Sequence, residues 1–500
     1  MTVASWIAFL VYALVAIGLG WRAAQAHDAG ADYWTAGRSL NAGAVGVSIS
    51  AGFMSVSWSC VYAVQLFYWY GVGALWLITV PWLLALGGIY WLSQRYHDLD
   101  AFSQPEMVGH RFGAPARRVV AIALAFVFLV WGGAEIYVAA TLLAPGMGVT
   151  TTTLILLISL IVAVYATLGG FRAVVSTDKL QYGIVAAYIL AMGWLAMRGL
   201  RSSSLWLDAG PGAGSAWTAL WQAPVMGART NRPWMELLDP GLATIVLTFV
   251  AYLPGWLFET DLWLRVQAAR DTRAARRGVT IAAVNSALFV GLLPLFIGMA
   301  ALVIYPLQAG EFPPEIGIEG DAIFAALVRD FAPAWLALLV SIGLVAAAMS
   351  TIDTCANVMA LSIGYDLLRI HQRAPADAAR WSRGVTLAAV GAACLFALNT
   401  ESLWDIFYLS SGVLTTAVAF PVAAVFLPWA RPRAVTWSAT AGLVGTVAAY
   451  FLESRSLLTA IEPTVLADSG LGYIFWGCLA ATLGYGLGRI APADPASEAG

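Results

Sequence analysis

Long apolar runs recur from one end of the sequence to the other, and they limit the possible folds more than any other feature. A helix needs about 20 mostly apolar residues to cross a bilayer core. Charged residues make up only 11% of the chain, against about 25% in soluble domains. The sequence therefore predicts an all-α integral membrane protein with about 13 transmembrane helices. The net charge of −2 provides no basic surface, so we expect contact with membrane lipid and no nucleic-acid partner.

The predicted spans follow the apolar runs, with boundaries accurate to a few residues. They are 3–21, 43–69, 74–94, 119–144, 150–168, 174–197, 240–264, 278–305, 333–368, 384–399, 403–428, 435–452 and 470–488. No basic residue precedes the first run and no small-residue cleavage motif follows it. We therefore expect the first run to remain as a span and not to be removed as a signal peptide.

The distribution of Lys and Arg predicts the orientation, because cytoplasmic loops retain basic residues. With the N-terminus outside, 20 of the 26 basic residues lie in inside connections. These connections are 22–42, 95–118, 169–179, 265–277, 369–383, 429–434 and the C-terminal tail. Five arginines between Arg265 and Arg277 are interpreted as an inside anchor, and the connection 198–239 is expected outside. We predict a multi-pass protein of the bacterial cytoplasmic (inner) membrane, N-terminus outside and C-terminus cytoplasmic.

Two predicted spans contain breaks. The polar run 55–59 interrupts the second span, and Pro254-Gly255 interrupts the seventh, with Glu259 and Asp261 close behind. Broken helices at corresponding positions of two five-helix halves indicate an inverted-repeat transporter with its binding site at the bilayer midplane. The alternative is that these Gly and Pro residues serve only helix packing, as is common in membranes.

The ninth span carries adjacent hydroxyls at Ser350 and Thr351, followed by Asp353. Together with carbonyls freed at a helix break, such hydroxyls could bind a hard monovalent cation. Ser and Thr in membrane helices also commonly bond back to the carbonyl one turn earlier, which is the alternative for an isolated pair. The carboxylate favours an ion site, because it is costly at membrane depth unless it is paired or bound.

Several motifs resemble those of the sodium/solute symporter family, which includes sodium-coupled sugar, proline, pantothenate and sialic acid carriers. Residues 165–181 read YATLGGFRAVVSTDKLQ and are similar to the signature of that family. Residues 347–354, 37–40, 105–106 and 111–113 also resemble the family pattern. The resemblance covers most of the first 430 residues.

The resemblance implies a LeuT-type fold of two inverted five-helix repeats, formed by spans 2–6 and 7–11. The implied division of the chain is 1–42, an extra helix and loop; 43–199, the first repeat; 200–239, an external loop; 240–428, the second repeat; and 429–500, two further helices and a short tail.

The resemblance also implies a sodium site. Its ligands would be the carbonyls of Ala51, Met54 and Ala347 and the hydroxyls of Ser350 and Thr351, with Asp178 close by on the cytoplasmic side. Some family members bind a second sodium, and Asp353 and Thr354 occupy the corresponding positions. Family members often have Gln before the arginine that matches Arg265, whereas this chain has Leu264, so a sugar contact there is not implied.

Four residues are candidates for solute binding. Glu135 lies mid-span in the fourth span, and Glu259 follows the second break. Trp58 and Trp256 adjoin the two breaks and could add cation-π contacts. Alternatively, Glu135 is protonated and bonds to a neighbouring helix, Glu259 pairs with Arg265, and the tryptophans serve packing. The carboxylates favour a solute with an amino or other cationic group.

The sequence thus predicts a carrier, not an enzyme. It would perform sodium-coupled secondary active uptake of a small organic solute by alternating access, with sodium as the coupling ion and no obligate protein partner. One alternative is a transporter-like solute sensor; the chain has no kinase-like region, so a sensor would need a separate signalling partner. An ion channel is disfavoured, because no filter-like sequence is present.

Overall fold

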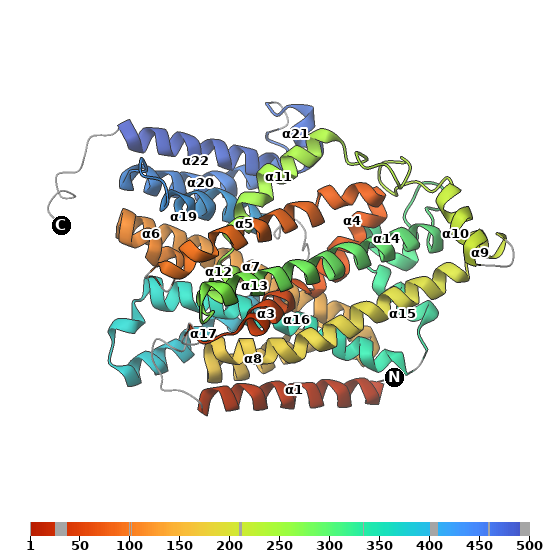
Figure 1. Ribbon diagram of the computed structural model, residues 1–500, viewed down its shortest axis with the longest axis horizontal. Coiled ribbons are helices and arrows are strands. Elements are labelled where there is room, and N and C mark those ends of the chain that lie inside the picture. The colour runs from red at the N-terminus through yellow and green to blue at the C-terminus, as the bar shows by residue number, and fades with distance from the viewer. Residues whose placement is uncertain are drawn as a thin grey trace.

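The structure, a computed structural model, describes residues 2–25, 38–99, 101, 103–209, 213–333, 335–400, 409–458 and 461–490. Helices account for the regular secondary structure of these residues, and most of the long ones run roughly parallel to one another (Figure 1). The main helices are α1 (Thr2–Gln25), α3 (Ala42–Phe53), η2 (Val56–Tyr62), α4 (Ala63–Tyr70), α5 (Thr79–Asp98), α6 (Gln104–Phe112), α7 (Ala114–Met147), α8 (Thr151–Arg201), α9 (Ser204–Leu207), α10 (Ala213–Gln222), α11 (Leu242–Leu257), α12 (Thr260–Gln267), α13 (Thr272–Ser286), α14 (Leu293–Ile304), α15 (Ile323–Phe331), α16 (Leu336–Ala360), α17 (Pro375–Asn399), η9 (Leu414–Ala419), α19 (Phe420–Ala424), α20 (Pro432–Glu453) and α22 (Gly472–Ile490).

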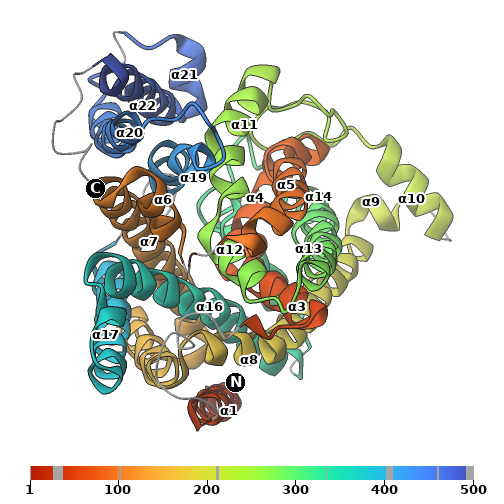
Figure 2. The same cartoon turned by 60° about the vertical axis from the view of Figure 1, so that its left-hand side comes forward.

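The first and last helices lie outside a central bundle. Helix α1 packs against α8 and α16 on one side, and α20 and α22 pair with each other on the opposite side (Figures 1 and 2). Between them, α16 packs against α7 and α8, while α13 packs against α3 and α5. The elements that build the site described below therefore all come from the central bundle.

The helices are long and apolar enough for a multi-pass membrane protein. Among the described residues, eight helices could each cross a membrane, or nine if the bent pair Ala42–Phe53 and Val56–Trp76 forms one span. Shorter apolar helices cover Trp6–Arg22 and Leu409–Ala424. Each of the predicted spans overlaps a helix, although residues 403–408 lie outside the described part of the chain. The total of about 13 remains a prediction.

The first broken helix lies where the sequence places it. Helix α3 ends at Phe53, Met54 has a non-helical ψ of 51°, and Ser55 is extended before the chain re-enters a helix. The two halves meet at an angle of 61°. The hydroxyl of Ser55 accepts a hydrogen bond from the amide of Trp58 at 3.0 Å and so caps the second half.

The second break differs from its predicted position. Pro254 lies inside α11, which continues to Leu257, and the chain leaves the helical conformation only at Phe258 and Glu259. A proline removes one intrahelical hydrogen bond, and neighbouring bonds can keep a membrane helix intact around it. The prediction that Pro254-Gly255 itself forms the break is therefore wrong by about one turn.

The predicted connection 169–179 is also shorter than expected. Helix α8 contains two apolar segments, Thr151–Leu168 and Ala173–Arg201. They are separated by Gly170, whose φ of 55° and ψ of −150° interrupt the helix. A positive φ is readily adopted by glycine, so one residue provides the change of direction and Lys179 lies within a helix.

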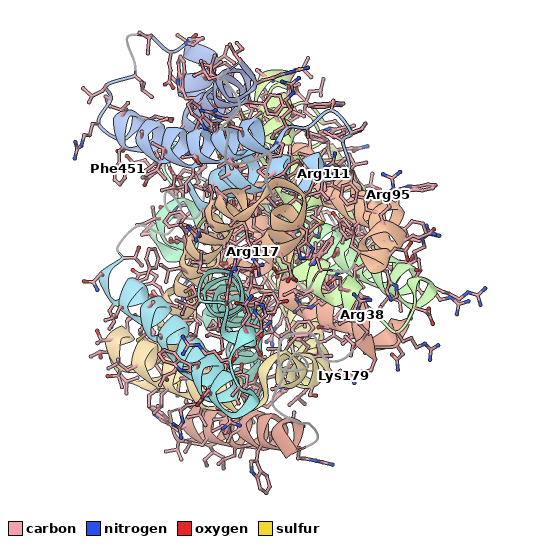
Figure 3. All side chains as sticks on the ribbon, turned by 90° about the vertical axis from the view of Figure 1, so that its left-hand side faces the viewer. Arg38, Arg95, Arg111, Arg117, Lys179 and Phe451 are labelled. Atoms are coloured by element: carbon pink, nitrogen blue, oxygen red, sulfur yellow. The ribbon has the colours of Figure 1, made fainter. Side chains whose placement is uncertain are left out.

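Different helix ends lie at the two ends of the bundle. The start of α1 and helices α9 and α10 lie at the right-hand end in Figure 1, whereas α6 and the end of α22 lie at the left. Figure 3 looks onto the left-hand end and shows Arg38, Arg95, Arg111 and Lys179 on that side. These positions agree with the alternation expected from the sequence, while the direction of the bundle in the membrane remains a prediction.

Candidate sodium and solute site

The first helix break exposes carbonyl oxygens that α16 meets with hydroxyl groups. The last carbonyls of any helix lack intrahelical partners, and here they belong to buried or partly buried residues at the end of α3. The hydroxyl of Ser350 donates to the carbonyl of Ala51 at 3.0 Å. The hydroxyl of Thr351 donates to the carbonyl of Gly52 at 3.3 Å. Helix α16 therefore closes the open end of α3 with neutral oxygen groups.

The same two hydroxyls also reach the carbonyl of Ala347, at 2.8 Å from Ser350 and 3.4 Å from Thr351. They thus make the back-bond expected for an isolated pair, and in addition they cross to α3. Oxygen ligands lie about 2.3–2.6 Å from Ca²⁺, an ion of nearly the same radius as Na⁺, so ligands at right angles would be about 3.3–3.7 Å apart. A small adjustment would let these oxygens surround Na⁺, with Met54 buried at the break beside them.

Arg265 is the main correction to the sequence interpretation. It was expected in the cytoplasmic anchor, but its side chain is 0% exposed in the protein core. Its guanidinium donates to the hydroxyl of Ser48 at 2.8 Å and to that of Thr354 at 2.9 Å. It also pairs with Asp261 at 3.2 Å and with Asp178 at 3.4 Å. The physical reason is that α12 continues to Gln267, and a buried arginine requires such charge partners.

Asp178 therefore lies in a polar network next to the first break. Its carboxylate accepts hydrogen bonds from the hydroxyl of Ser48, on α3, and from Arg265. Arg265 links this carboxylate to Thr354 on α16. The i,i+4 spacing of Asp261 and Arg265 on one helix face was a signal in the sequence that could have indicated this buried pair.

The candidates for a second sodium site, Asp353 and Thr354, point to different partners. Asp353 accepts a hydrogen bond from the hydroxyl of Tyr165 at 2.8 Å and one from Thr177 at 3.3 Å. Thr354 donates to the carbonyl of Ser350 at 3.0 Å and faces Arg265. Oδ1 of Asp353 has no hydrogen-bond partner among the described residues. Asp353 thus has capacity for a further ligand, whereas Thr354 belongs to the arginine network.

A cavity of about 70 Å³ adjoins the sodium-site residues. All four predicted solute-binding residues line it: Trp58, Glu135, Trp256 and Glu259. The other lining residues are Gly52, Phe53, Ser55, Ser57, Trp82, Phe128, Trp131, Asp261, Thr351, Thr354, Cys355 and Ser411. Thr351 therefore belongs to both the candidate sodium site and the cavity. The sequence did not single out Trp82, Phe128 or Trp131, because aromatic residues are frequent throughout this chain.

Glu135 connects the cavity to the first break. One of its carboxylate oxygens accepts hydrogen bonds from the amide of Ser57 at 3.2 Å and from the Ser57 hydroxyl. The other oxygen, Oε2, is buried and has no hydrogen-bond partner among the described residues. The bond to a neighbouring helix, considered above as an alternative, is therefore present, and one acceptor of Glu135 remains available.

Aromatic rings form the walls of the cavity. Trp256 is nearly perpendicular to Trp58, with ring centres 5.3 Å apart, and to Trp82, with ring centres 5.5 Å apart. Tyr252 stacks on the ring of Trp256 at 5.3 Å. Three tryptophans from three different helical segments therefore make a rigid aromatic corner beside the carboxylates.

A second, larger cavity of about 1130 Å³ leads away from this site. It shares Ser57 and Trp58 with the small cavity and reaches Arg229, Glu319 and Leu471. Arg229 pairs with Glu319 at 3.5 Å near its mouth. The large cavity thus opens toward the end of the bundle that carries α9 and α10 (Figure 1).

Helix α6 contacts the second break through Gln104. The side-chain amide of Gln104 donates to the carbonyl of Phe258 at 2.8 Å and accepts from the hydroxyl of Thr260 at 2.5 Å. These contacts hold α6 against the second break. Arg111, also on α6, donates to the carbonyls of Val425 and Leu427. The small cavity thus adjoins the larger one on one side, while α6 contacts the second break and the segment after α19.

The chain is similar to known sodium-coupled cotransporters in sequence and in fold. The chain is 26% identical to the sodium/glucose cotransporter of Vibrio parahaemolyticus over 397 residues, which is 72% of this chain and 68% of the relative. It is 25% identical to the sodium/iodide cotransporter of Homo sapiens, covering 95% of this chain and 69% of the relative. The fold matches that of a Na⁺-coupled sialic acid symporter in a substrate-bound outward-open state, with a TM-score of 0.73, 16% identity and 98% coverage of both chains.

The fold is therefore that of the LeuT-type transporters. A family model of the sodium:solute symporter family matches residues 33–442, which is most of the 500-residue chain. The chain belongs to the sodium:solute symporter family and is a multi-pass membrane carrier, not an enzyme, that couples solute uptake to sodium ions.

Proposed function

We propose that this protein takes up a small, amine-bearing organic solute together with sodium across the bacterial cytoplasmic membrane. The observation that carries the proposal is the position of Thr351. Its hydroxyl lies at the candidate sodium site, 3.3 Å from the carbonyl of Gly52, and it also lines the solute cavity. Ion and solute would therefore act on the same side chain.

In this proposal sodium is bound by the carbonyls of Ala51, Met54 and Ala347 and the hydroxyls of Ser350 and Thr351. The ion would fix the end of α3 relative to α16, and the fixed break would hold Trp58 and the rest of η2 in place for the solute. Because binding free energies are reciprocal, bound solute would raise the affinity for sodium by the same factor. Asp178 and Arg265 would hold α3 and α12 together through their contacts with each other and with Ser48.

The charge of the cavity supports a cationic solute. Three carboxylates line it, from Glu135, Glu259 and Asp261, and no Lys, Arg or His is among its described lining residues. Arg265, which contacts Asp261 of the lining, is also paired with Asp178. An anion would face repulsion here, whereas an ammonium group would satisfy a carboxylate that is costly at membrane depth.

A second sodium is proposed at Asp353. Oδ1 of this carboxylate is without a hydrogen-bond partner among the described residues, and Tyr165 and Thr177 supply neighbouring hydroxyls. Thr354, one turn from Ser350, would contribute only by rotating away from Arg265.

Transport would proceed by alternating access between residues 43–199 and 240–428, the two proposed repeats. Residues 1–42 and 429–500 would add peripheral helices, and 200–239 would form an external loop. With the N-terminus outside, the large cavity faces the exterior, and inward opening requires α6 to release Phe258 and Thr260. Each sodium charge that crosses would gain about 2.3 kcal/mol per 100 mV of membrane potential.

Labelling of introduced cysteines tests the orientation. A cysteine at Ser203 should react with an impermeant reagent in whole cells, and a cysteine at Arg273 should react only after the membrane is opened. Endogenous cysteines lie buried or partly buried, and the unmodified protein is the control. The reverse labelling pattern would invert the orientation and the proposed direction of uptake.

Counterflow in proteoliposomes tests the transport function. We expect a labelled amine to accumulate against unlabelled amine inside, with sodium on both sides, and not when sodium is replaced by potassium. A transporter-like sensor that works with a separate signalling partner would bind the amine without counterflow. That outcome would exclude the carrier proposal.

A further inference from the structure

We infer that the solute carries a methylated ammonium group, most favourably a quaternary one, and that the aromatic corner formed by Trp58, Trp82 and Trp256 selects it. This inference rests on the proposed function, which requires a cationic solute, and it specifies the chemistry of the cationic group.

The walls of the cavity carry the first argument. Six of its sixteen lining residues are aromatic, and four of these six are tryptophans. Trp256 lies at 84° to Trp58 and at 80° to Trp82, so two rings approach it almost at right angles. A cation within about 6 Å of a ring centre is attracted by the ring, most strongly by tryptophan. With centres 5.3 and 5.5 Å apart, a cation against this corner would meet several rings at once.

The supply of hydrogen-bond acceptors carries the second argument. A primary ammonium has three N–H donors that need partners when it is buried. Glu135 already accepts two bonds from Ser57 through Oε1 and keeps only Oε2 without a partner. Asp261 accepts from Arg265 through Oδ2 and keeps Oδ1 without a hydrogen-bond partner among the described residues. Glu135 and Asp261 therefore leave two such carboxylate oxygens for the three donors of a primary ammonium.

A quaternary ammonium has no N–H donor, so it leaves none unsatisfied in such a site. Its methyl groups would contact the rings, while the carboxylates of Glu135 and Glu259 would balance its charge through space. Aromatic walls with a nearby negative charge are the arrangement used for quaternary ammonium ligands in general.

The size of the small cavity restricts the part of the solute that lies beside the aromatic corner. A volume of about 70 Å³ corresponds to about five to seven water molecules at roughly 10–15 Å³ each. A trimethylammonium group with a tail of two or three heavy atoms matches this space. A longer tail would extend past Ser57 and Trp58, which the small cavity shares with the larger one.

A methylation series tests the inference on the purified, full-length protein. Sodium-dependent binding would be measured for ethanolamine, its N-methyl and N,N-dimethyl derivatives, and choline, together with the neutral isostere 3,3-dimethyl-1-butanol. We expect affinity to rise with each methyl group, by about tenfold over the series, and the neutral isostere to bind at least about tenfold more weakly than choline.

Two matched variants examine the corner itself. Trp256→Leu removes the π face and should abolish the rise along the series, while Trp256→Phe should retain most of it. Trp91→Leu, which changes a tryptophan that is 76% exposed on α5, is the control and should bind like the parent. Stabilisation of the protein by sodium alone, measured by thermal shift, should persist in all three and shows that each is folded.

The outcomes separate this inference from the proposed function. Sodium-dependent binding that is equal or strongest for ethanolamine would overturn the methylated-ammonium inference and leave the amine carrier intact. Binding of 3,3-dimethyl-1-butanol as tight as that of choline would also overturn it, because the corner would then select the solute by its shape and not by its positive charge. No sodium-dependent binding of any amine would overturn both.

Discussion

The two helix breaks differ in geometry and in chemistry. The first is bent by 61°, whereas Leu242–Gln267, which contains the second, passes as one span. At the first break, between Met54 and Ser55, the groups that meet α16 are backbone carbonyls and hydroxyls, all formally neutral. At the second, after Phe258, the chain supplies Glu259, Asp261 and the buried Arg265. Neutral oxygen ligands suit a small cation that must both bind and dissociate. Charged side chains suit a different task, because they can orient a charged solute and hold neighbouring helices together by ion pairs. The comparison shows that the groups exposed at each break determine which kind of ligand it suits.

The largest effect is expected at Arg265, which joins the two breaks. Arg265→Met would leave Asp178 and Asp261 buried without their counter-charge, and loss of one partner of a buried ion pair costs about 3–5 kcal/mol. We expect a large loss of folded protein, measured by size-exclusion chromatography in detergent and by thermal unfolding. Arg270→Ala is the matched control, because Arg270 follows α12 and its side chain is 64% exposed. Equal stability of the two variants would show that the arginine network does not connect the breaks.

The next largest effect is expected on sodium binding at the first helix break. Replacement of both Ser350 and Thr351 by Ala removes two of five proposed ligands, and we expect the sodium concentration for half-maximal uptake to rise by about tenfold or more, which corresponds to about 1.4 kcal/mol or more. Uptake at graded sodium concentrations, corrected for expression, measures this change. Thr440→Ala, on the exposed face of α20, should leave the sodium dependence as it is. A sodium dependence in the double variant like that of the parent would remove these hydroxyls from the site.

A smaller effect should distinguish solute binding from sodium binding. Glu135→Gln keeps the shape of the side chain and removes its charge, so solute affinity should fall by about tenfold, or about 1.4 kcal/mol. Sodium binding should change little, because Glu135 contacts Ser57 and none of the proposed sodium ligands. Titration calorimetry or thermal shift with each ligand measures both affinities, with Glu236→Gln in the 198–239 connection as control. Unchanged amine binding would exclude a counter-charge role for Glu135.

The smallest effect is expected at the contact of α6 with the second break. Gln104→Leu removes the hydrogen bonds to Phe258 and Thr260, each worth about 0.5–1.5 kcal/mol, and should shift the protein toward the inward-open state by a modest factor. A cysteine placed at Phe258 keeps the backbone carbonyl that Gln104 contacts. Faster labelling of this cysteine in Gln104→Leu than with Gln104 present would report the shift. Labelling rates that do not change would show that α6 does not hold the second break closed.

The structure brings the residues of the predicted neutral site together, whereas it places Arg265 of the charged region elsewhere than expected. Adjacent hydroxyls on one turn and a family motif are local features, so the amino-acid order alone is enough to select Ser350, Thr351 and Asp178. Arg265 was misassigned because a count of basic residues does not reveal where α12 ends. The break was placed at Pro254 because a proline predicts lost hydrogen bonds, whereas the chain departs from the helix one turn later.

The aromatic walls could not be predicted in the same way. Trp82 and Trp131 come from α5 and α7, and only the packing of these helices brings their rings to the cavity of Trp256. The chain contains 22 tryptophans, and most positions are equally compatible with lipid contact or helix packing. The fold class followed from apolar runs and helix breaks, but the selection of cavity-facing rings depends on helix rotation.

The most direct test of coupling between the two breaks is the reciprocity of binding. Affinity for the amine would be measured at zero and saturating sodium, and affinity for sodium at zero and saturating amine, on the same purified protein. In the proposed site ion and solute would share Thr351, so each ligand should raise the affinity for the other, and the two factors should be equal. Amine affinity that is the same with and without sodium would contradict a coupled site at Thr351.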